Sequence, residues 1–187
     1  ELELDRDSLQ RALSALLDHH DALRLRWELH DTQWRQANAL PEPVEVLHEV
    51  DLSKAEDLGA EIRQAAELAQ RSLSLKDGPL LRVVWIRTAA GLADRLLLVA
   101  HHVVVDGVSW RILLEDLVEG YRASVDRRPV ELPAKTTSFQ AWATRLRTPE
   151  LRAAVEDERD YWHALPWSAA ADVPQDSAGS NSEGQAR

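Results

Sequence analysis

The chain has 187 residues, of which 44% are hydrophobic and 29% are charged, values that suit a globular protein with one sizeable core. A formal net charge of −10 with no run of Lys or Arg argues against nucleic acid and anionic membrane surfaces as partners. Because cysteine, a stretch of about 20 apolar residues and a signal peptide are all lacking, the sequence excludes disulfides and thiolate chemistry and predicts a cytoplasmic location.

The first quarter of the chain predicts one helix and three strands. Apolar side chains recur at helical spacing in residues 8–20, and Asp7 is the natural N-cap. Alternating or β-rich segments then predict strands at 22–29, 32–38 and 43–50. We expect the first two of these strands to pair across a short turn.

The middle of the chain predicts a helix followed by two strands. Ser53 and Glu56 form a capping box, which opens a helix that reaches about residue 73. Strands are expected at 80–87 and 95–105. Since the second is apolar almost throughout, we expect both its faces to be covered and its place in the sheet to be central.

The last third predicts helices and then a linker. Residues 109–125 carry a continuous apolar stripe, and helices are expected from Ser138 and, with Thr148 as cap, from Pro149 to about residue 165. Small and polar residues dominate 168–187, as in a flexible linker or loop. The mixture of strands and helices predicts an α/β fold of the α+β sandwich type, with helices packed on a mixed sheet.

The run His101-His102-Val103-Val104-Val105-Asp106-Gly107 is the strongest candidate for chemistry. Because successive strand side chains point to opposite faces, one histidine is expected to face a cleft and the other to pack. Histidine suits proton transfer near neutral pH. Asp106 is expected to cap the next helix or pair with a buried arginine, and Gly107 to allow a sharp turn.

Two other interpretations of this run stay open on the residues alone. Adjacent histidines in an apolar strand are also compatible with satisfied core residues. A zinc site is disfavoured, because neighbouring strand residues diverge and no other ligand spacing is present, so no metal site is predicted. His19, His20 and His163 are interpreted as packed or solvated helix residues.

Several segments, in order, resemble a known family. HHVVVDG (101–107) is similar to the HHxxxDG signature of chloramphenicol-acetyltransferase-like enzymes, which include the condensation and epimerization domains of nonribosomal peptide synthetases. HHDALRLRW (19–27) and DYWHAL (160–165) resemble further segments of this family, and DGVSWRILLEDL (106–117) and KTTSFQAW (135–142) are similar to epimerization domains. The resemblance implies a chloramphenicol-acetyltransferase-like fold.

The resemblance also implies roles for individual residues. His102 matches the family's proton-handling histidine, with His101 and Gly107 as supporting residues of the motif. Asp106 matches an aspartate that forms a salt bridge to an arginine, for which Arg24 is the candidate and Arg26 the competitor. Trp110 favours epimerization over condensation.

The implied activity is inversion of the Cα of an aminoacyl or peptidyl thioester held on the phosphopantetheine of a peptidyl carrier protein domain, with no cofactor bound directly. A condensation domain that forms peptide bonds is the alternative, as is an inactive fragment that only binds a carrier. Since the chain has no Met, we expect a fragment. In that interpretation 1–167 form an N-terminal subdomain and 168–187 lead to a C-terminal subdomain carrying a second catalytic residue, a glutamate.

Overall fold

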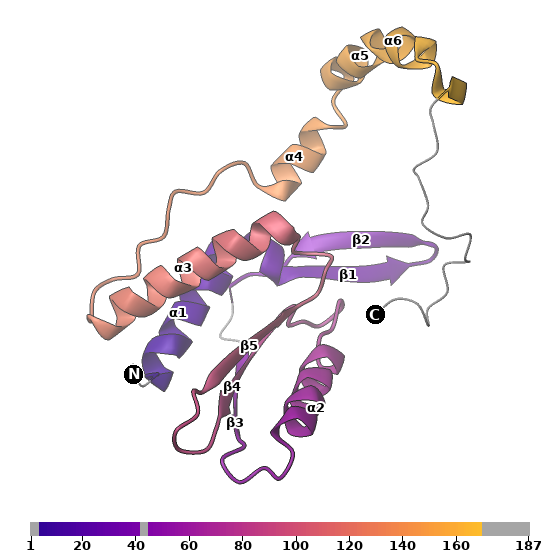
Figure 1. Ribbon diagram of the computed structural model, residues 1–187. Coiled ribbons are helices and arrows are strands. Elements are labelled where there is room, and N and C mark those ends of the chain that lie inside the picture. Colours follow the sequence, from indigo (N-terminus) through magenta and orange to yellow (C-terminus); the bar gives the residue numbers. More distant parts are fainter. Residues whose placement is uncertain (1–3, 42–44, 170–187) are drawn as a thin grey trace. The chain divides into compact units, whose positions relative to one another are not determined.

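The computed structural model describes residues 4–41 and 45–169, and the chain divides into two compact units, Glu1–Phe139 and Gln140–Arg187 (Figure 1). The elements of the first unit are α1 (Arg6–His19), β1 (Leu25–His30), β2 (Gln33–Asn38), β3 (Leu47–Asp51), α2 (Leu58–Arg71), β4 (Leu81–Arg87), β5 (Arg95–Ala100) and α3 (Gly107–Val125). Three short helices follow: α4 (Phe139–Arg145), which begins on the last residue of that unit, α5 (Pro149–Asp157) and α6 (Arg159–Ala164).

A mixed three-stranded sheet forms the centre of the first unit, in the order β3-β4-β5. β3 runs parallel to β4 with Leu47 opposite Val83, and β5 runs antiparallel to β4 with Leu98 opposite the same valine. Alternate side chains of each strand point to opposite faces, and both faces are apolar. The predicted combination of a mixed sheet and packed helices is confirmed.

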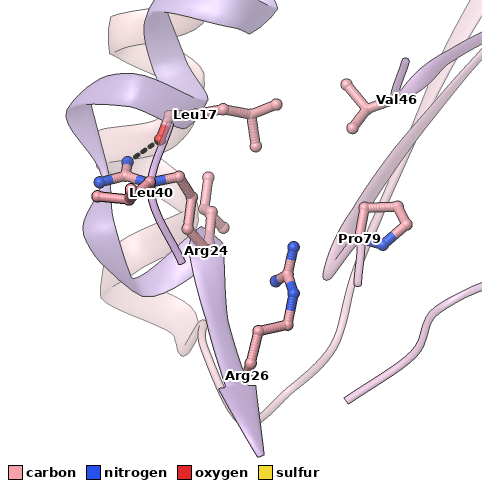
Figure 2. A pocket seen from close by; sticks show the side chains of 7 residues that line it. Leu17, Arg24, Arg26, Leu40, Val46 and Pro79 are labelled. Carbon is pink, nitrogen blue, oxygen red and sulfur yellow. Dashed lines mark hydrogen bonds between the residues drawn. The ribbon is translucent and has the colours of Figure 1, made fainter. Parts of the chain in front are cut away.

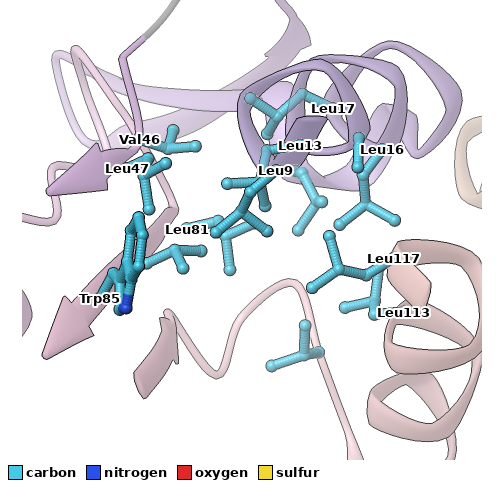
Figure 3. Close-up of a cluster of buried hydrophobic side chains, with 14 residues drawn as sticks. Leu9, Leu13, Leu16, Leu17, Val46, Leu47, Leu81, Trp85, Leu113 and Leu117 are labelled. Carbon is cyan, nitrogen blue, oxygen red and sulfur yellow. The ribbon is translucent and has the colours of Figure 1, made fainter. Parts of the chain in front are cut away.

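Helices α1 and α3 cover one face of the sheet and α2 covers the other (Figure 1). The larger core joins the leucine stripe of α1 to side chains of β3, β4 and α3, as Figure 3 shows for Leu9, Leu13, Leu16, Leu47, Leu81, Trp85, Leu113 and Leu117. Gly120 of α3 lies where the two helices meet, and a Cβ there would lie 3.4 Å from Cβ of Ala12. The smaller core lies under α2 and includes Ala69, Val84 and Ile86.

Both predicted helix starts in the first half are corrected by the structure. α1 begins earlier than expected, because the carboxylate of Asp5, not that of Asp7, accepts the Ser8 N–H at 2.8 Å. The predicted capping box is wrong, because α2 starts after Asp57, whose carboxylate accepts the Ala60 N–H at 2.9 Å. Aspartate is a good N-cap residue wherever a helix starts. The apolar pattern of a helix therefore does not decide which of several neighbouring polar residues is its N-cap.

The predicted hairpin is confirmed, with β1 and β2 antiparallel and Leu25 opposite Asn38. β1 starts later than expected, because residues Asp21–Arg24 form a 3₁₀ turn. Asp31 turns the chain with φ of 55°, a left-handed conformation that aspartate tolerates better than most residues. β3 likewise starts later than predicted, and residues 43 and 44 of the predicted segment 43–50 lie outside the described residues.

The predicted strand 95–105 is only partly correct. Its faces are covered, since Leu96 and Leu98 contact the larger core and Leu97 and Val99 the smaller one. However, β5 ends at Ala100 and is an edge of the sheet among the described residues, while β4 is central. Val105, at the end of the apolar run, is not part of the strand but is buried in the larger core after the turn.

The helices after the motif depart from the prediction in detail. On α3, Leu113 and Leu117 are buried as expected, but Leu114 and Val118 of the same predicted stripe are exposed. Thr148 caps α5 as predicted, and the expected single helix to residue 165 is interrupted at Glu158. Residues 170–187 of the predicted linker lie outside the described residues, so the proposed boundary at residues 167 and 168 stays a prediction. No helix in the described part of the chain combines the length and apolar character of a membrane span.

Candidate functional site

The candidate site lies in a turn between β5 and α3. His101 still donates its backbone N–H to the Leu80 carbonyl at 2.9 Å, and the Val104 N–H then donates to the His101 carbonyl at 3.0 Å. Residues 101–104 therefore form a turn, not the end of a strand as predicted. The His102 side chain is exposed at this turn. Its position is compatible with access by a substrate and excludes a sealed core histidine within the described residues.

The two histidines have different environments, as expected, but the cause is the turn and not strand alternation. His101 is half-buried, and its Nδ1 accepts the Val103 N–H at 3.2 Å. This side-chain-to-backbone hydrogen bond stabilises the turn. His101 is thus a structural neighbour of an exposed His102.

Asp106 is the N-cap of α3, one of the two roles predicted for it. Its Oδ1 accepts the Ser109 hydroxyl at 2.6 Å and the Ser109 N–H at 2.7 Å. These two hydrogen bonds, the hydroxyl first, lower the pKa of Asp106 below its ordinary value. The carboxylate is exposed, so it is not the buried partner of an arginine.

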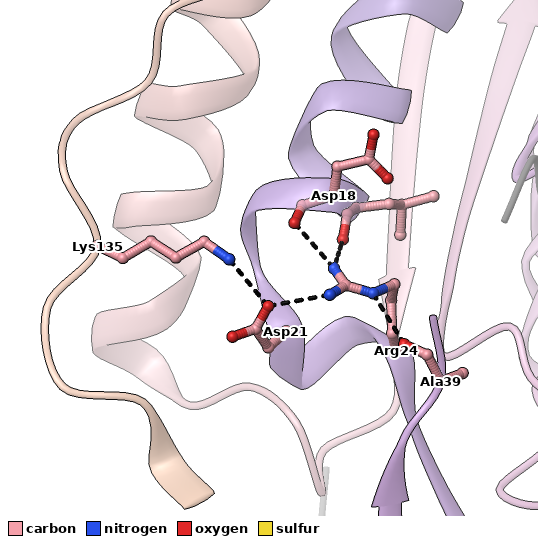
Figure 4. Close-up of polar contacts among 6 residues, drawn as sticks. Asp18, Asp21, Arg24, Ala39 and Lys135 are labelled. Carbon is pink, nitrogen blue, oxygen red and sulfur yellow. Dashed lines mark hydrogen bonds and ion pairs between the residues drawn. The ribbon is translucent and has the colours of Figure 1, made fainter. Parts of the chain in front are cut away.

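The predicted Arg24–Asp106 ion pair is wrong for this structure. Arg24 instead pairs with Asp21, with Nη2 3.0 Å from Oδ1 (Figure 4). The same guanidinium donates to the carbonyls of Leu17 and Asp18 at the C-terminus of α1, and to that of Ala39. A cation that binds the last carbonyls of a helix stabilises its negative end. Arg24 therefore ties α1 to the start of the hairpin.

Asp21 is also bound from a distant segment. Lys135 Nζ lies 2.9 Å from Asp21 Oδ1 (Figure 4). The hydrogen bond from Lys135, and then that from Arg24, holds the pKa of Asp21 below its ordinary value. The HHDALRLRW segment thus forms a polar junction that fixes the end of α1, and it does not reach the Asp106 turn through an ion pair.

A small open pocket lies near this junction, and Figure 2 shows the side chains that line it. Its lining consists of Leu17, Leu23, Arg24, Arg26, Leu40, Val46 and Pro79. The Arg26 side chain passes so close to Gly78 that a Cβ there would lie 2.3 Å from the guanidinium, and Gly78 also has φ of 72°. His102 does not line this pocket, so the cleft that one of the two histidines is expected to face stays a prediction.

Gly107 and Trp110 are the two remaining candidate residues, and neither contacts His102 through an interaction that the structure shows. Gly107 opens α3 without a positive φ, and a Cβ there would meet no described atom within 4 Å, so the sharp turn expected of it is not observed. Trp110 is half-buried against the larger core. It packs the first turn of α3 against that core.

The contact between His20 and Asp116 was not predicted either. His20 Nε2 lies 2.7 Å from Asp116 Oδ2, joining the end of α1 to the middle of α3. His19 is adjacent, and burial, followed by the neighbouring His20, lowers its pKa. Asp116 is buried on the core side of α3, a polar interruption in an apolar stripe. That interruption was the available signal, but its partner is 96 residues away.

The Asp106 cap leads to a stability prediction. Asp106→Ala is expected to lower the melting temperature at neutral pH, whereas Asp106→Asn retains most of the stability because asparagine is an equally good N-cap. Since the folded pKa is depressed, the stabilisation is present above the ordinary Asp pKa of about 3.9 and is lost as pH falls through the folded value. Thermal unfolding of the complete domain between pH 7 and 3 should show the gap to the Ala variant narrowing. A constant gap would contradict the assignment.

Comparison with known proteins agrees with this arrangement. The family model described as "Condensation domain" matches residues 1–185. The chain is 41% identical over 162 residues to a linear gramicidin synthase polypeptide of Brevibacillus parabrevis, covering 85% of the chain and 3% of that relative. The epimerization domain from the third module of tyrocidine synthetase B superposes with a TM-score of 0.80 at 33% identity, covering 95% of the chain and 40% of that structure.

A solved condensation domain is similar as well. The first condensation domain of the calcium-dependent antibiotic synthetase gives a TM-score of 0.66 at 27% identity, over 91% of the chain and 41% of that structure. The chain thus spans about two fifths of the length of these solved domains. The family match, the shared fold and the ordered motifs agree, and the chain belongs to the condensation and epimerization domain family of nonribosomal peptide synthetases.

Proposed function

We propose that this chain is the histidine-bearing part of an epimerization domain, which inverts the Cα of an aminoacyl or peptidyl thioester. The observation that carries the proposal is the exposed His102 in the turn before α3, within a chain whose fold is similar to a solved epimerization domain at 33% identity. The substrate would be held on the phosphopantetheine of a carrier protein domain, as the resemblance of the motifs implies.

In this mechanism His102 is an acid/base residue. The thioester acidifies the Cα–H, and the neutral imidazole takes that proton to leave an enolate and an imidazolium. A second group donates a proton to the opposite face of Cα, which inverts the centre and regenerates the thioester. The resemblance implies that this second group is a glutamate in the part of the domain beyond this chain. The positive end of the α3 dipole, close in sequence to His102, would favour the negative charge of the enolate.

Condensation is the second candidate, and the family match supports it directly. There the same histidine would orient or deprotonate an amine that attacks the thioester of a second carrier-bound substrate. The two functions differ in their products: epimerization changes the configuration of one residue, whereas condensation forms a new peptide bond. The similarity of 106–117 and 135–142 to epimerization domains favours the first.

A product analysis tests the proposal. The complete domain, given an L-aminoacyl thioester on its carrier, is expected to yield a mixture of D and L residues by chiral chromatography after hydrolysis. The 187-residue chain alone is expected to yield no D residue, because it lacks the second acid/base. D residues produced by the isolated chain would contradict the two-subdomain mechanism, and a complete domain that leaves configuration unchanged would contradict epimerization.

A further inference from the structure

The three side chains of His19, His20 and Asp116 converge outside the His102 turn. One ligand atom from each, two imidazole nitrogens and one carboxylate oxygen, lies within 4.8 Å of the other two. His20 Nε2 and Asp116 Oδ2 are already 2.7 Å apart. Two imidazoles and a carboxylate are a donor set that suits Zn²⁺ and related divalent transition metals.

The cluster is built on rigid elements. His19 and His20 end α1, and Asp116 lies in the middle of α3, two helices whose facing leucines form the larger core. Asp116 is nearly covered, with 9% of its side chain exposed, while 21% of the His20 side chain is exposed. The carboxylate is thus buried, while the two imidazoles beside it keep part of their surface accessible to solvent.

The charges around the cluster are compatible with a cation. The C-terminus of α1 carries the negative end of the helix dipole, directly at the two histidines. Asp21 and Lys135 are also close to His19 and form an ion pair of 2.9 Å. Arg24 binds Asp21 as well and donates to the Leu17 and Asp18 carbonyls, so it offsets the negative end of the helix. The negative charge that attracts a cation to the cluster is therefore that of Asp116, one of its ligands.

We propose that His19, His20 and Asp116 bind a divalent transition-metal ion, with Zn²⁺ as the fitting example, in a tetrahedral site completed by water. Ligand atoms in such a site are about 3.3 Å apart, given metal–ligand distances of about 2.0–2.1 Å. The His20–Asp116 pair must open by about half an ångström, and the His19 ring must rotate inward. The ion replaces the hydrogen bond as the link between α1 and α3. This site is separate from the proposed chemistry of His102.

Titration of Zn²⁺ into the complete domain, measured by calorimetry, tests the proposal. The wild type is expected to bind one equivalent that His19→Asn and Asp116→Asn lose or bind at least tenfold more weakly. Asparagine at position 116 keeps an acceptor for His20, and circular dichroism checks that both variants are folded. His163→Asn, which changes an exposed histidine of α6, is the matched control and should bind as the wild type does.

Thermal unfolding gives a second measurement. Zn²⁺ should raise the melting temperature of the wild type and of His163→Asn, but not that of His19→Asn. Binding of the same strength and stoichiometry in all four proteins, or no specific equivalent in the wild type, would overturn the proposal. Neither result depends on the reaction that His102 performs, so the site and the proposed function fail independently.

Discussion

Replacing His102 with alanine in the complete domain is expected to lower the single-turnover rate of epimerization by about 10²–10⁴, the usual contribution of a general acid or base. In the proposed mechanism the exposed imidazole of His102 accepts the Cα proton, and alanine offers no group that can do so. Because α3 is capped by Asp106 and the turn is held by His101, the substitution should leave the fold intact. The measurement is rapid-quench sampling of a carrier loaded with one aminoacyl thioester.

His30→Ala is the matched control for this variant. His30 is an exposed histidine at the end of β1 that contacts Glu28, so its loss removes an imidazole without touching the His102 turn. We expect the control to epimerize at the wild-type rate, and both variants to bind the loaded carrier equally well. A full rate in His102→Ala, or an equal loss in the control, would remove His102 from the proton transfer.

The second large effect is expected in the core. Leu13→Ala should lower the free energy of unfolding by about 2–5 kcal/mol, because the leucine is fully buried and its loss leaves a cavity. Leu13 faces the junction of α1 with the sheet and α3, where the surrounding leucines come from separate elements (Figure 3). Denaturant unfolding of the complete domain measures this change.

Leu68→Ala provides the comparison, since this side chain of α2 is 60% exposed. Alanine is a good helix former, and we expect its effect to stay within about 0.5 kcal/mol. If Leu13→Ala were as mild as Leu68→Ala, the larger core would not hold α1 to the sheet as described.

Local periodicity predicted much of this fold. The amphipathic pattern of α1, the alternation around the β1–β2 hairpin and the β-rich run of β4 each combine a strong spacing with clear turn residues. These signals depend on neighbours along the chain. The same is true of Thr148 and Pro149, where the cap and the first helical residue are adjacent.

The rest depends on contacts that are distant in sequence. Residues 101–105 follow a strand without any turn residue, but the backbone turns at 101–104 and buries Val105 in the larger core, and no local pattern indicates this. Arg24 binds Asp21 and carbonyls at the end of α1, while Asp106 binds Ser109. The two residues that were expected to meet each find partners nearby in the sequence. The His20–Asp116 contact was missed because its two partners belong to different helices.

The sequence singled out His102 as the candidate residue but did not predict the turn that exposes it. His102 was selected by the HHxxxDG pattern and is exposed, as access to substrate requires. His102 is exposed because it lies in a turn that His101 stabilises, not because strand side chains alternate between faces. The role of His102 in proton transfer stays a prediction.

Deuterium wash-in at Cα tests the central claim most directly. The complete domain, incubated in D₂O with a carrier-bound L-aminoacyl thioester, is expected to yield inverted residues that carry deuterium at Cα, with wash-in lost in His102→Ala. Mass spectrometry of the released residue gives both quantities together. Residues that keep their original Cα proton while the domain forms a peptide bond would contradict the account and indicate condensation.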